Sequence, residues 1–330
     1  MKAILCKQPG PAESLVIEDI PSPTAKGSGV KIRVHAAGLN FPDTLIIQGK
    51  YQIKPSFPFA PGGEMAGEVI EIGDKVTRYQ VGDKVMGLTG YGAFAEEIVV
   101  AEQNLIPLPA GMSYQQGAAF TMVYGTSYYA LKQRANLQPG ETLLVLGASG
   151  GVGLATVELG KAMGARVIAC ASSDEKLAIA KAAGADELIN YSKEDLKEAV
   201  KSLTKGQGAN VIYDPVGGEY SEQALRAIAW EGRHLVIGFA AGEIPKMPLN
   251  LTLLKGCQIM GVFWGAFTMR DPKTNFANML ELLELYAAGK IQPHISKVFA
   301  FRDYSAALNC LSERIATGKI VLTLPVEEKL

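Results

Sequence analysis

The stretch Leu143–Gly153, read as Leu-Leu-Val-Leu-Gly-Ala-Ser-Gly-Gly-Val-Gly, decides the fold of this chain. An apolar run ends in a glycine-rich turn, and the helical pattern Leu154–Met163 follows directly. A second apolar strand is predicted at Arg166–Ala171. A strand, a glycine-rich turn, a helix and a second strand in this order predict a dinucleotide-binding unit.

The turn itself has the properties of a diphosphate-binding site. Residues without bulk let the backbone approach the anion, and the N-terminus of the following helix offers N–H groups and a positive dipole end. Ala148 stands where the first glycine of the G-x-G-x-x-G fingerprint is expected, before Gly150 and Gly153. A purely structural turn is the alternative, but the context favours a diphosphate on Ser149, Gly150, Gly151 and Val152.

Composition narrows the class of protein. At about 150 residues per domain, 330 residues predict two domains. A formal net charge of -1 without a basic run gives no support to nucleic-acid binding. The N-terminus has no signal-peptide pattern, and no apolar run reaches the roughly 20 residues that cross a bilayer, so we expect a cytoplasmic protein. The four cysteines stand singly, which predicts reduced thiols: Cys6, Cys170, Cys257 and Cys310.

The hydrophobic pattern changes near residue 141. Before it, short alternating strands punctuated by Gly and Pro indicate a small barrel or sandwich. After it, strands alternate with helices, which predicts a parallel sheet covered on both faces, and hence an α/β protein. We expect the tail to return to the first domain, with domains at 1–123 plus 264–330 and at 124–263. The predicted strands are 30–36, 68–72, 84–86, 95–100, 142–147, 166–170, 187–190, 210–214, 233–238, 257–263, 291–298 and 319–324. The predicted helices are 151–163, 174–183, 193–203, 220–230, 275–288 and 303–316.

Several motifs along the whole chain resemble one family. They are Ala36–Asp43, Pro61–Glu64, Val81–Val85, the turn Ala148–Gly153, Tyr213–Gly218, Ala229–Arg233, Gly238–Gly242 and Trp264-Gly265. Together they resemble the medium-chain dehydrogenase/reductase superfamily, specifically its zinc-free quinone oxidoreductase branch. The resemblance implies a GroES-like β-barrel catalytic domain joined to a Rossmann domain with a doubly wound parallel sheet.

The resemblance also raises the question of zinc. Zinc-dependent relatives carry a Cys, a His and a further Cys, Asp or Glu at the catalytic metal. Here Asn40 or a neighbour stands at the first position, and the family's Gly-His-Glu reads Gly62-Gly63-Glu64. Zinc needs about three protein ligands, and Glu64 and Asp43 alone do not supply them. We therefore predict no metal, and reduction of an activated, conjugated acceptor as the remaining chemistry.

The residues after the second strand of the dinucleotide-binding unit favour NADPH over NADH. An acid at the tip of that strand holds the ribose hydroxyls in NAD-binding domains. Here the strand ends in Ala171 and Ser172, and the next acids suit the N-terminus of the following helix. In NADPH-dependent quinone oxidoreductases a lysine and a tyrosine at the positions of Lys176 and Tyr191 bind the 2′-phosphate. A solvated lysine and a tyrosine capping a strand are the alternative.

Two residues are predicted at the reacting end. Asn40, by its family position, hydrogen-bonds a substrate carbonyl or the nicotinamide ribose; alternatively it holds a tight turn. Tyr51 matches a tyrosine of the quinone pocket and also the catalytic tyrosine of 2-enoyl thioester reductases. Its phenol can hydrogen-bond a developing oxyanion and deliver a proton. A second pocket tyrosine of some quinone reductases falls at Leu45, which makes the pocket more apolar.

The remaining predicted cofactor contacts lie at strand ends and beside the nicotinamide. Aromatic residues among them have ordinary core packing as an equal alternative. They are Thr126, Val216, Phe239, Phe263, Trp264 and Gly265.

The resemblance leaves three functions open. We expect a reductase of a small quinone or enone; an enoyl-thioester or enone C=C reductase and an NADPH-binding protein without turnover are the alternatives. The apolar strand 257–263 is predicted at a sheet edge, where exposed strands pair readily. In the family this strand pairs with its symmetry mate, so we expect a homodimer.

Overall fold

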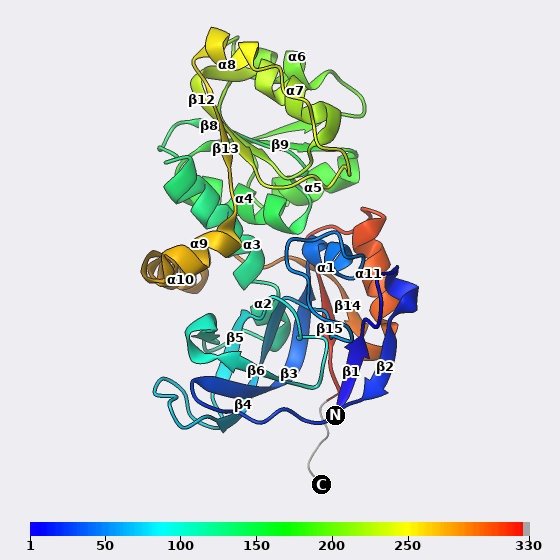
Figure 1. Ribbon diagram of the computed structural model, residues 1–330. Coiled ribbons are helices and arrows are strands. Elements are labelled where there is room, and N and C mark those ends of the chain that lie inside the picture. The colour runs from blue at the N-terminus through cyan, green and yellow to red at the C-terminus, as the bar shows by residue number, and fades with distance from the viewer. Residues whose placement is uncertain (326–330) are drawn as a thin grey trace. The chain divides into compact units, whose positions relative to one another are not determined.

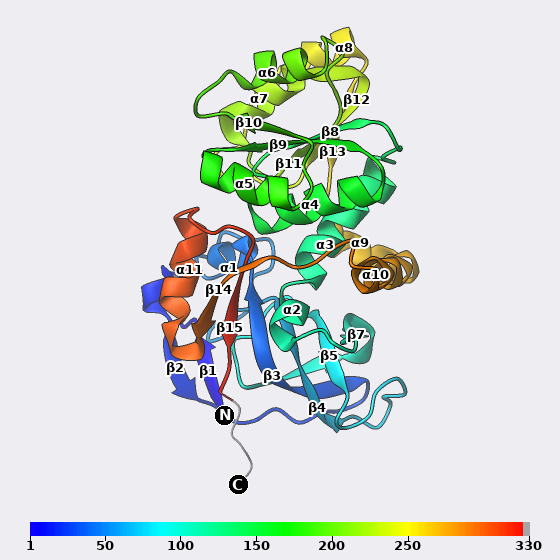
Figure 2. The same ribbon diagram turned by 180° about the vertical axis from the view of Figure 1, so that it is seen from behind.

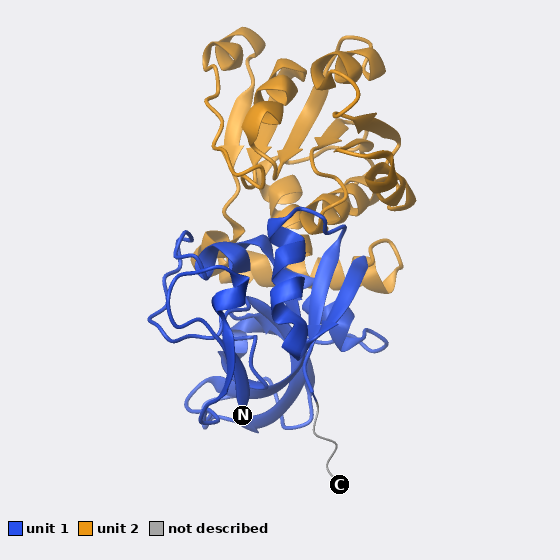
Figure 3. Ribbon diagram, turned by 90° about the vertical axis from the view of Figure 1, so that its right-hand side faces the viewer, with its two compact units in different colours: residues 1–122, 293–330 blue, residues 123–292 orange. Residues whose placement is uncertain are grey.

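The computed structural model describes residues 1–325, which form two compact units (Figure 3). Unit 1 comprises Met1–Met122 and the chain from Pro293 onward, and unit 2 is the continuous segment Val123–Gln292. Among residues 1–325, no helix is long and apolar enough to cross a membrane.

Unit 2 is built around the predicted parallel sheet (Figure 1). Within the described chain it has six strands in the order β10-β9-β8-β11-β12-β13, and every neighbouring pair is parallel. The order reverses beside β8, the first strand of the unit, which is the doubly wound Rossmann arrangement. The strands are β8 (Thr142–Val145), β9 (Arg166–Ala171), β10 (Glu187–Asn190), β11 (Ala209–Asp214), β12 (Ile228–Val236) and β13 (Gln258–Gly261).

Helices cover both faces of this sheet, with α4 and α5 on one face and α6 and α7 on the other (Figures 1 and 2). Apolar strand residues such as Leu144 and Ile212 form one core cluster with Val200 of α6 and Leu225 of α7. The short helices α8 and α9 were not predicted from the sequence. The helices of unit 2 are α4 (Gly151–Ala162), α5 (Asp174–Ala182), α6 (Leu196–Leu203), α7 (Gly218–Arg226), α8 (Asn250–Lys255), α9 (Trp264–Arg270) and α10 (Pro272–Ala287).

Unit 1 is the GroES-like, β-rich part, with one core cluster inside its bent sheet. That sheet runs in the order β14-β15-β3-β4-β5-β7, and β6 also pairs with β3. Its strands are β3 (Gly29–Leu39), β4 (Glu64–Ile72), β5 (Lys84–Leu88), β6 (Glu97–Ala101), β7 (Leu105–Pro107), β14 (Ile295–Ala300) and β15 (Lys319–Thr323). A separate hairpin is formed by β1 (Lys2–Leu5) and β2 (Val16–Asp19), and the helices are α1 (Phe41–Ile46), α2 (Tyr114–Ala118) and α11 (Tyr304–Ser312). Helix α3 (Thr121–Tyr129) begins in unit 1 and continues in unit 2.

The segment 264–292 belongs to unit 2, whereas the sequence placed the whole tail from residue 264 with the first domain. The reason is its packing on α3 and on the π-helical turn Ala130–Arg134 that follows. The ring of Phe267 stacks on Tyr129 at 4.2 Å between centroids. The tail returns to the first unit only from Pro293, where β15 pairs antiparallel with β3.

One carboxylate binds both ends of unit 2. Glu158 of α4 accepts a hydrogen bond from the hydroxyl of Tyr124 at 2.5 Å. The same carboxylate accepts the backbone N–H of Gln292 at 3.3 Å. Burial raises the pKa of Glu158 to about 7, although both hydrogen bonds oppose this shift. The second and the last residue of this unit are therefore held at one point of α4.

Candidate active site

Most of the predicted cofactor residues lie in turns that follow the carboxyl ends of the parallel strands of unit 2. These turns line one edge of the sheet, the edge formed by the strand ends and not by an outer strand. Because all strands run in one direction, the turns that follow them meet at that edge. The turn after β8 carries Ser149–Val152, Ser172 follows β9, and Tyr191 follows β10. Val216, Phe239 and Phe263 come after β11, β12 and β13. Thr126 lies instead on α3, where it is half-buried.

Close packing around the glycine turn explains why glycine is needed at particular positions in it. A Cβ on Gly153 would lie 2.3 Å from the carbonyl oxygen of Gly147. Helix α4 therefore approaches the turn more closely than a residue with a side chain at position 153 would allow. Gly147 has a φ of +59° and faces Val216, whose Cγ2 would be 2.9 Å from an added Cβ. Gly150 is the N-cap of α4. The first N–H groups of a helix have no partner within it and are suited to bind an anion.

Three predicted residues converge beside the end of β9. The Nζ of Lys176 lies 3.4 Å from the hydroxyl of Ser172. Tyr191 also shares a hydrogen bond with Ser172, and its ring packs on Tyr220 at 4.2 Å. Burial, with a smaller contribution from Tyr220, raises the pKa of Tyr191 to about 12. One ammonium and two hydroxyls thus gather where the second ribose of a dinucleotide binds in this fold.

The two acids of the same turn are engaged elsewhere. Asp174 accepts hydrogen bonds from Asn190 Nδ2 at 2.6 Å and from Lys193 Nζ at 2.5 Å. These two partners hold the pKa of Asp174 below its usual value, with Lys193 contributing most. Glu175 shares a hydrogen bond with the side chain of Ser173, the N-cap of α5. Of the two acids, only Glu175 binds the N-cap residue of α5, whereas Asp174 binds Asn190 and Lys193.

A buried cluster that the sequence did not single out holds the turn after β11. Asp214 Oδ1 accepts the backbone N–H groups of Val216 and Gly217, both at 2.9 Å. Its Oδ2 accepts from the hydroxyl of Ser221 and lies 3.1 Å from His234 Nε2. Burial alone would raise the pKa of Asp214, but His234 and the N–H donors lower it. In the sequence, Asp214 stood at the end of a predicted strand and within the motif Tyr213–Gly218, but it was not named as a site residue.

The predicted aromatic contacts divide into two groups. Trp264 is buried: its ring lies against the backbone of Gly125, where an added Cβ would be 2.2 Å from Cζ2. Its Nε1 donates to Asn275 Oδ1 at 3.0 Å, so its role includes core packing. Phe263 and Phe239 are exposed, as is Gly265. Phe239 lies beside the turn after β11, because an added Cβ on Gly217 would be 3.0 Å from its ring.

In unit 1, Asn40 belongs to a buried polar cluster at the end of β3. Its Oδ1 accepts from Lys319 Nζ at 2.6 Å. Its Nδ2 donates to Glu64 Oε2 at 3.0 Å and to the carbonyl of Gly38 at 3.3 Å. The same Lys319 donates to Glu64 Oε2 at 3.0 Å. The amide of Asn40 is therefore held by partners within unit 1, and Lys319 was not predicted as a site residue.

Asp43 completes this cluster and extends it toward Tyr51. Its carboxylate accepts the backbone N–H of Asn40 at 2.7 Å and that of Gly63 at 3.1 Å. Burial raises the pKa of Asp43 to about 7, with Glu64 adding to the rise and Lys319 opposing it. Tyr51 is half-buried against the core cluster of unit 1. Burial and the charge of Asp43 raise the pKa of its phenol.

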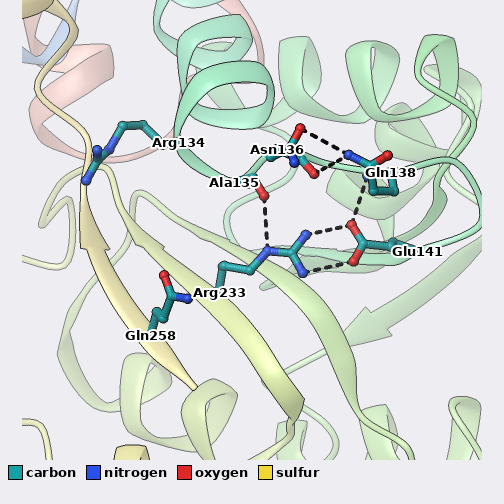
Figure 4. A pocket seen from close by; sticks show the side chains of 7 residues that line it. All are labelled: Arg134, Ala135, Asn136, Gln138, Glu141, Arg233 and Gln258. Atoms are coloured by element: carbon teal, nitrogen blue, oxygen red, sulfur yellow. Dashed lines mark hydrogen bonds and ion pairs between the residues drawn. The ribbon is translucent and has the colours of Figure 1, made fainter. Parts of the chain in front are cut away.

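Each unit also has a small pocket. In unit 1, an apolar pocket of about 220 Å³ lies beside the loop that carries Tyr51, lined by Pro9, Ile46, Gly49, Lys54, Pro55, Phe57 and Phe59. In unit 2, a polar pocket of about 360 Å³ contains Arg233, which binds the carboxylate of Glu141 with two hydrogen bonds (Figure 4). Arg134 extends away from this pair. Because Glu141 precedes β8, this pocket lies at the amino ends of the strands, away from the glycine turn.

Two family models match the chain. Residues 26–110 match the "Alcohol dehydrogenase GroES-like domain", and residues 151–284 match "Zinc-binding dehydrogenase". Among residues 1–325, no group of three or more His, Cys, Asp or Glu side chains is placed to hold a metal ion. At the positions where zinc relatives carry ligands, this chain has Asn40 or a neighbour, then Gly63, and a Glu64 that is already paired with Lys319. These side chains do not fit a zinc site.

Known proteins match nearly the whole chain in sequence and in structure. A "Quinone oxidoreductase-like protein 2 homolog" from Nematostella vectensis is 44% identical over 97% of this chain and 88% of its own length. A crystal structure of a Pseudomonas syringae quinone oxidoreductase matches with a TM-score of 0.91 and 34% identity, covering 98% of this chain and 99% of that one. The Escherichia coli quinone oxidoreductase complexed with NADPH matches with a TM-score of 0.91 and 28% identity, covering 98% of this chain and 100% of that one. The chain therefore belongs to the quinone oxidoreductase family of the medium-chain dehydrogenase/reductase superfamily and is an enzyme of that type.

Proposed function

We propose that this enzyme is an NADPH-dependent reductase that transfers a hydride to a quinone or a similar conjugated carbonyl acceptor without zinc. The convergence of Ser172, Lys176 and Tyr191 carries the choice of cofactor. A ribose 2′-phosphate is an anion with several acceptor oxygens, so an ammonium and two hydroxyls are suited to bind it. The nearby Asp174, which would repel a phosphate, is hydrogen-bonded to Asn190 and Lys193.

The rest of the cofactor site follows from the sheet edge. Ser149–Val152 and the N-terminus of α4 hold the diphosphate with backbone N–H groups. Val216, positioned by Asp214, lies against the glycine turn, and Phe239 follows at the next strand end. Thr126, Phe263, Trp264 and Gly265 remain predicted contacts of the nicotinamide half. When bound, NADPH supplies the hydride, and the protein supplies binding, orientation and electrostatics.

The chain's own chemistry at the reacting end is hydrogen bonding and proton supply. The ordinary pKa of a tyrosine, about 10, already keeps the phenol of Tyr51 protonated at neutral pH, so it can donate a hydrogen bond to the acceptor oxygen. The amide of Asn40 is held by Glu64 and Lys319, and we expect it to line the acceptor site. A conjugated acceptor takes a hydride without a Lewis acid, which agrees with side chains that do not fit zinc.

The test is nicotinamide oxidation, followed by absorbance with NADPH and with NADH. The acceptors are benzoquinone, phenanthrenequinone, a simple enone and crotonyl-CoA. We expect NADPH to be preferred and a quinone to be reduced fastest. Because water can protonate the hydroquinone anion that hydride transfer produces, Tyr51→Phe should lower kcat with a quinone by less than roughly tenfold. Tyr91→Phe, an exposed tyrosine of the same unit, is the matched control and should have no effect.

Other outcomes would assign a different function. A preference for crotonyl-CoA, with a loss of roughly a hundredfold in Tyr51→Phe, would identify a 2-enoyl thioester or enone C=C reductase with Tyr51 as proton donor. NADPH binding without turnover of any acceptor would identify a binding protein. A preference for NADH would contradict the role given to Lys176 and Tyr191.

We also propose that the protein is a homodimer that pairs along β13. This strand is at the edge of its sheet, and exposed edges of this kind pair readily. Large apolar side chains are exposed nearby on β12 and around α8: Trp230, Leu249, Leu253 and Leu254. Light scattering after size exclusion should give twice the mass of the chain, and Ile259→Pro should give a monomer. A monomeric wild type at micromolar concentration would contradict this proposal.

A further inference from the structure

Lys319 carries its ammonium group into the buried cluster of unit 1. It is the first residue of β15, and 4% of its side chain is exposed. The ammonium donates to three acceptors: the carbonyl of Leu39 at 2.9 Å, Asn40 Oδ1 at 2.6 Å and Glu64 Oε2 at 3.0 Å. An ammonium has three donors, so each one has a partner at this site.

These contacts leave the amide of Asn40 with one orientation. A lysine only donates hydrogen bonds and a carboxylate only accepts them. Oδ1 must therefore face Lys319, while Nδ2 must face Glu64 and the carbonyl of Gly38. A flipped amide would place Nδ2 against the ammonium and Oδ1 against the carboxylate, which breaks both hydrogen bonds.

Glu64 explains why a cation is needed here. Its side chain is fully buried, and its second oxygen, Oε1, accepts the backbone N–H of Met122 at 2.8 Å. A buried carboxylate is costly unless it is paired and hydrogen-bonded. Lys319 is the cation of this cluster, and it lies 255 positions from Glu64 in the sequence.

We propose that Lys319 is a positioning residue of the reductase site, which fixes the amide of Asn40 in one orientation and supplies the positive charge that Glu64 requires. The positive charge beside Glu64 is thus supplied by a side chain of the protein itself, the ammonium of Lys319. The proposal deepens the proposed function and rests on it, because the consequence for turnover depends on Asn40 lining the acceptor site.

The test uses a variant in which the buried charge is removed as a pair. Lys319→Met alone leaves Glu64 unpaired, and we expect it to lower the melting temperature strongly or to prevent folding. Lys319→Met/Glu64→Gln removes both charges and should fold. In this double variant Asn40 has no charged partners, so kcat with the best quinone should fall by roughly tenfold to a hundredfold, with the Kd of NADPH unchanged.

A matched control and a coupling measurement separate positioning from stability. Lys31→Met/Glu97→Gln removes a partly buried pair of the same unit, whose charged atoms are 2.9 Å apart, and should leave kcat unchanged. Asn40→Ala should lower kcat in the wild type but have little further effect in the Lys319→Met/Glu64→Gln background. Independent, additive losses, or an unchanged kcat in that double variant, would overturn the proposal.

A readout without turnover keeps this inference separate from the proposed function. In nitrogen-labelled protein, the side-chain amide of Asn40 should give one pair of slowly exchanging proton signals. In Lys319→Met/Glu64→Gln these signals should exchange faster or split, whereas identical signals would contradict the positioning role. If the wild type reduces no acceptor, the proposed function fails, and the amide signals still decide the role of Lys319.

Discussion

Two regions of the molecule are built in different ways. One is the nucleotide edge of unit 2, formed by the turns after the carboxyl ends of its strands, and the other is the Asn40 cluster of unit 1, formed by Asn40, Asp43, Glu64 and Lys319. At the nucleotide edge, the binding groups are backbone N–H groups and side chains that directly follow strand ends, and the central motif spans only Gly147–Gly153. In the cluster, Asn40 depends on Glu64, 24 positions away, and on Lys319, 279 positions away. The first kind of site depends on local geometry and the second on side chains that only the tertiary fold brings together.

The two regions each bury an aspartate that accepts two backbone N–H groups, and we expect opposite pH dependence. The pKa of Asp43 is raised to about 7 by burial with a contribution from Glu64, whereas that of Asp214 is lowered by His234 and its hydrogen bonds despite burial. A raised carboxyl pKa stabilises the fold at low pH and loses that effect as pH rises through the folded pKa. A lowered pKa stabilises above the unfolded value and is lost in acid.

Urea unfolding of Asp43→Asn and Asp214→Asn, each against the wild type, checks this contrast. From pH 5 to pH 8 the stability advantage of the wild type over Asp43→Asn should shrink, by roughly 3 kcal/mol at most. Its advantage over Asp214→Asn should not shrink until the pH falls below about 4. If the stability loss of the two variants depended on pH in the same way, the proposed electrostatic difference between the two regions would be wrong.

The next largest effect is expected on stability, because the nucleotide edge depends on close packing between backbone atoms. In Gly153→Ala the new Cβ meets the carbonyl oxygen of Gly147 at 2.3 Å, so unfolding free energy should fall by about 3 kcal/mol. Gly150→Ala is the matched control, since its Cβ would make an ordinary contact at 3.5 Å. Calorimetry should show a stability loss for Gly153→Ala alone, and equal losses would mean that close packing does not explain the spacing.

The smallest expected effect concerns a single side chain at that edge. Lys176→Met should weaken NADPH binding by roughly tenfold to a hundredfold, the value of one charge-assisted hydrogen bond, and leave NADH binding unchanged. Lys181→Met, on the same helix and bound to the carbonyl of Asp186, is the control. Titration calorimetry with both nucleotides decides the point; equal weakening of both would place Lys176 away from the 2′-phosphate.

The fold was predictable because its signals are local. Apart from the short helices α8 and α9, the alternation predicted after residue 141 matches the observed order of strands and helices. The domain boundary was not predictable. Helix α10 is amphipathic, but nothing in its pattern says which unit covers its apolar face, and contacts such as that between Gln133 and Asn278 decide it.

The candidate site was predictable to the same extent. Ser172 and Lys176 could be proposed because they follow the glycine turn at a short distance in the sequence and match positions of the family, and the structure brings their side chains together. Lys319 was missed because a lysine at the start of an apolar strand looks like a solvated end, and only the pairing of β15 with β3 carries it to Asn40.

The carboxylate of Glu158 has a consequence for engineering. Because it binds Tyr124 and Gln292, the second and the last residue of unit 2, the two ends of that uninterrupted segment are neighbours in space. Segments whose ends are close tolerate excision, transplantation and circular permutation. We therefore expect residues 123–292 to tolerate transplantation as a module, with the original ends joined by a short linker and the chain reopened at an exposed turn such as Lys205-Gly206.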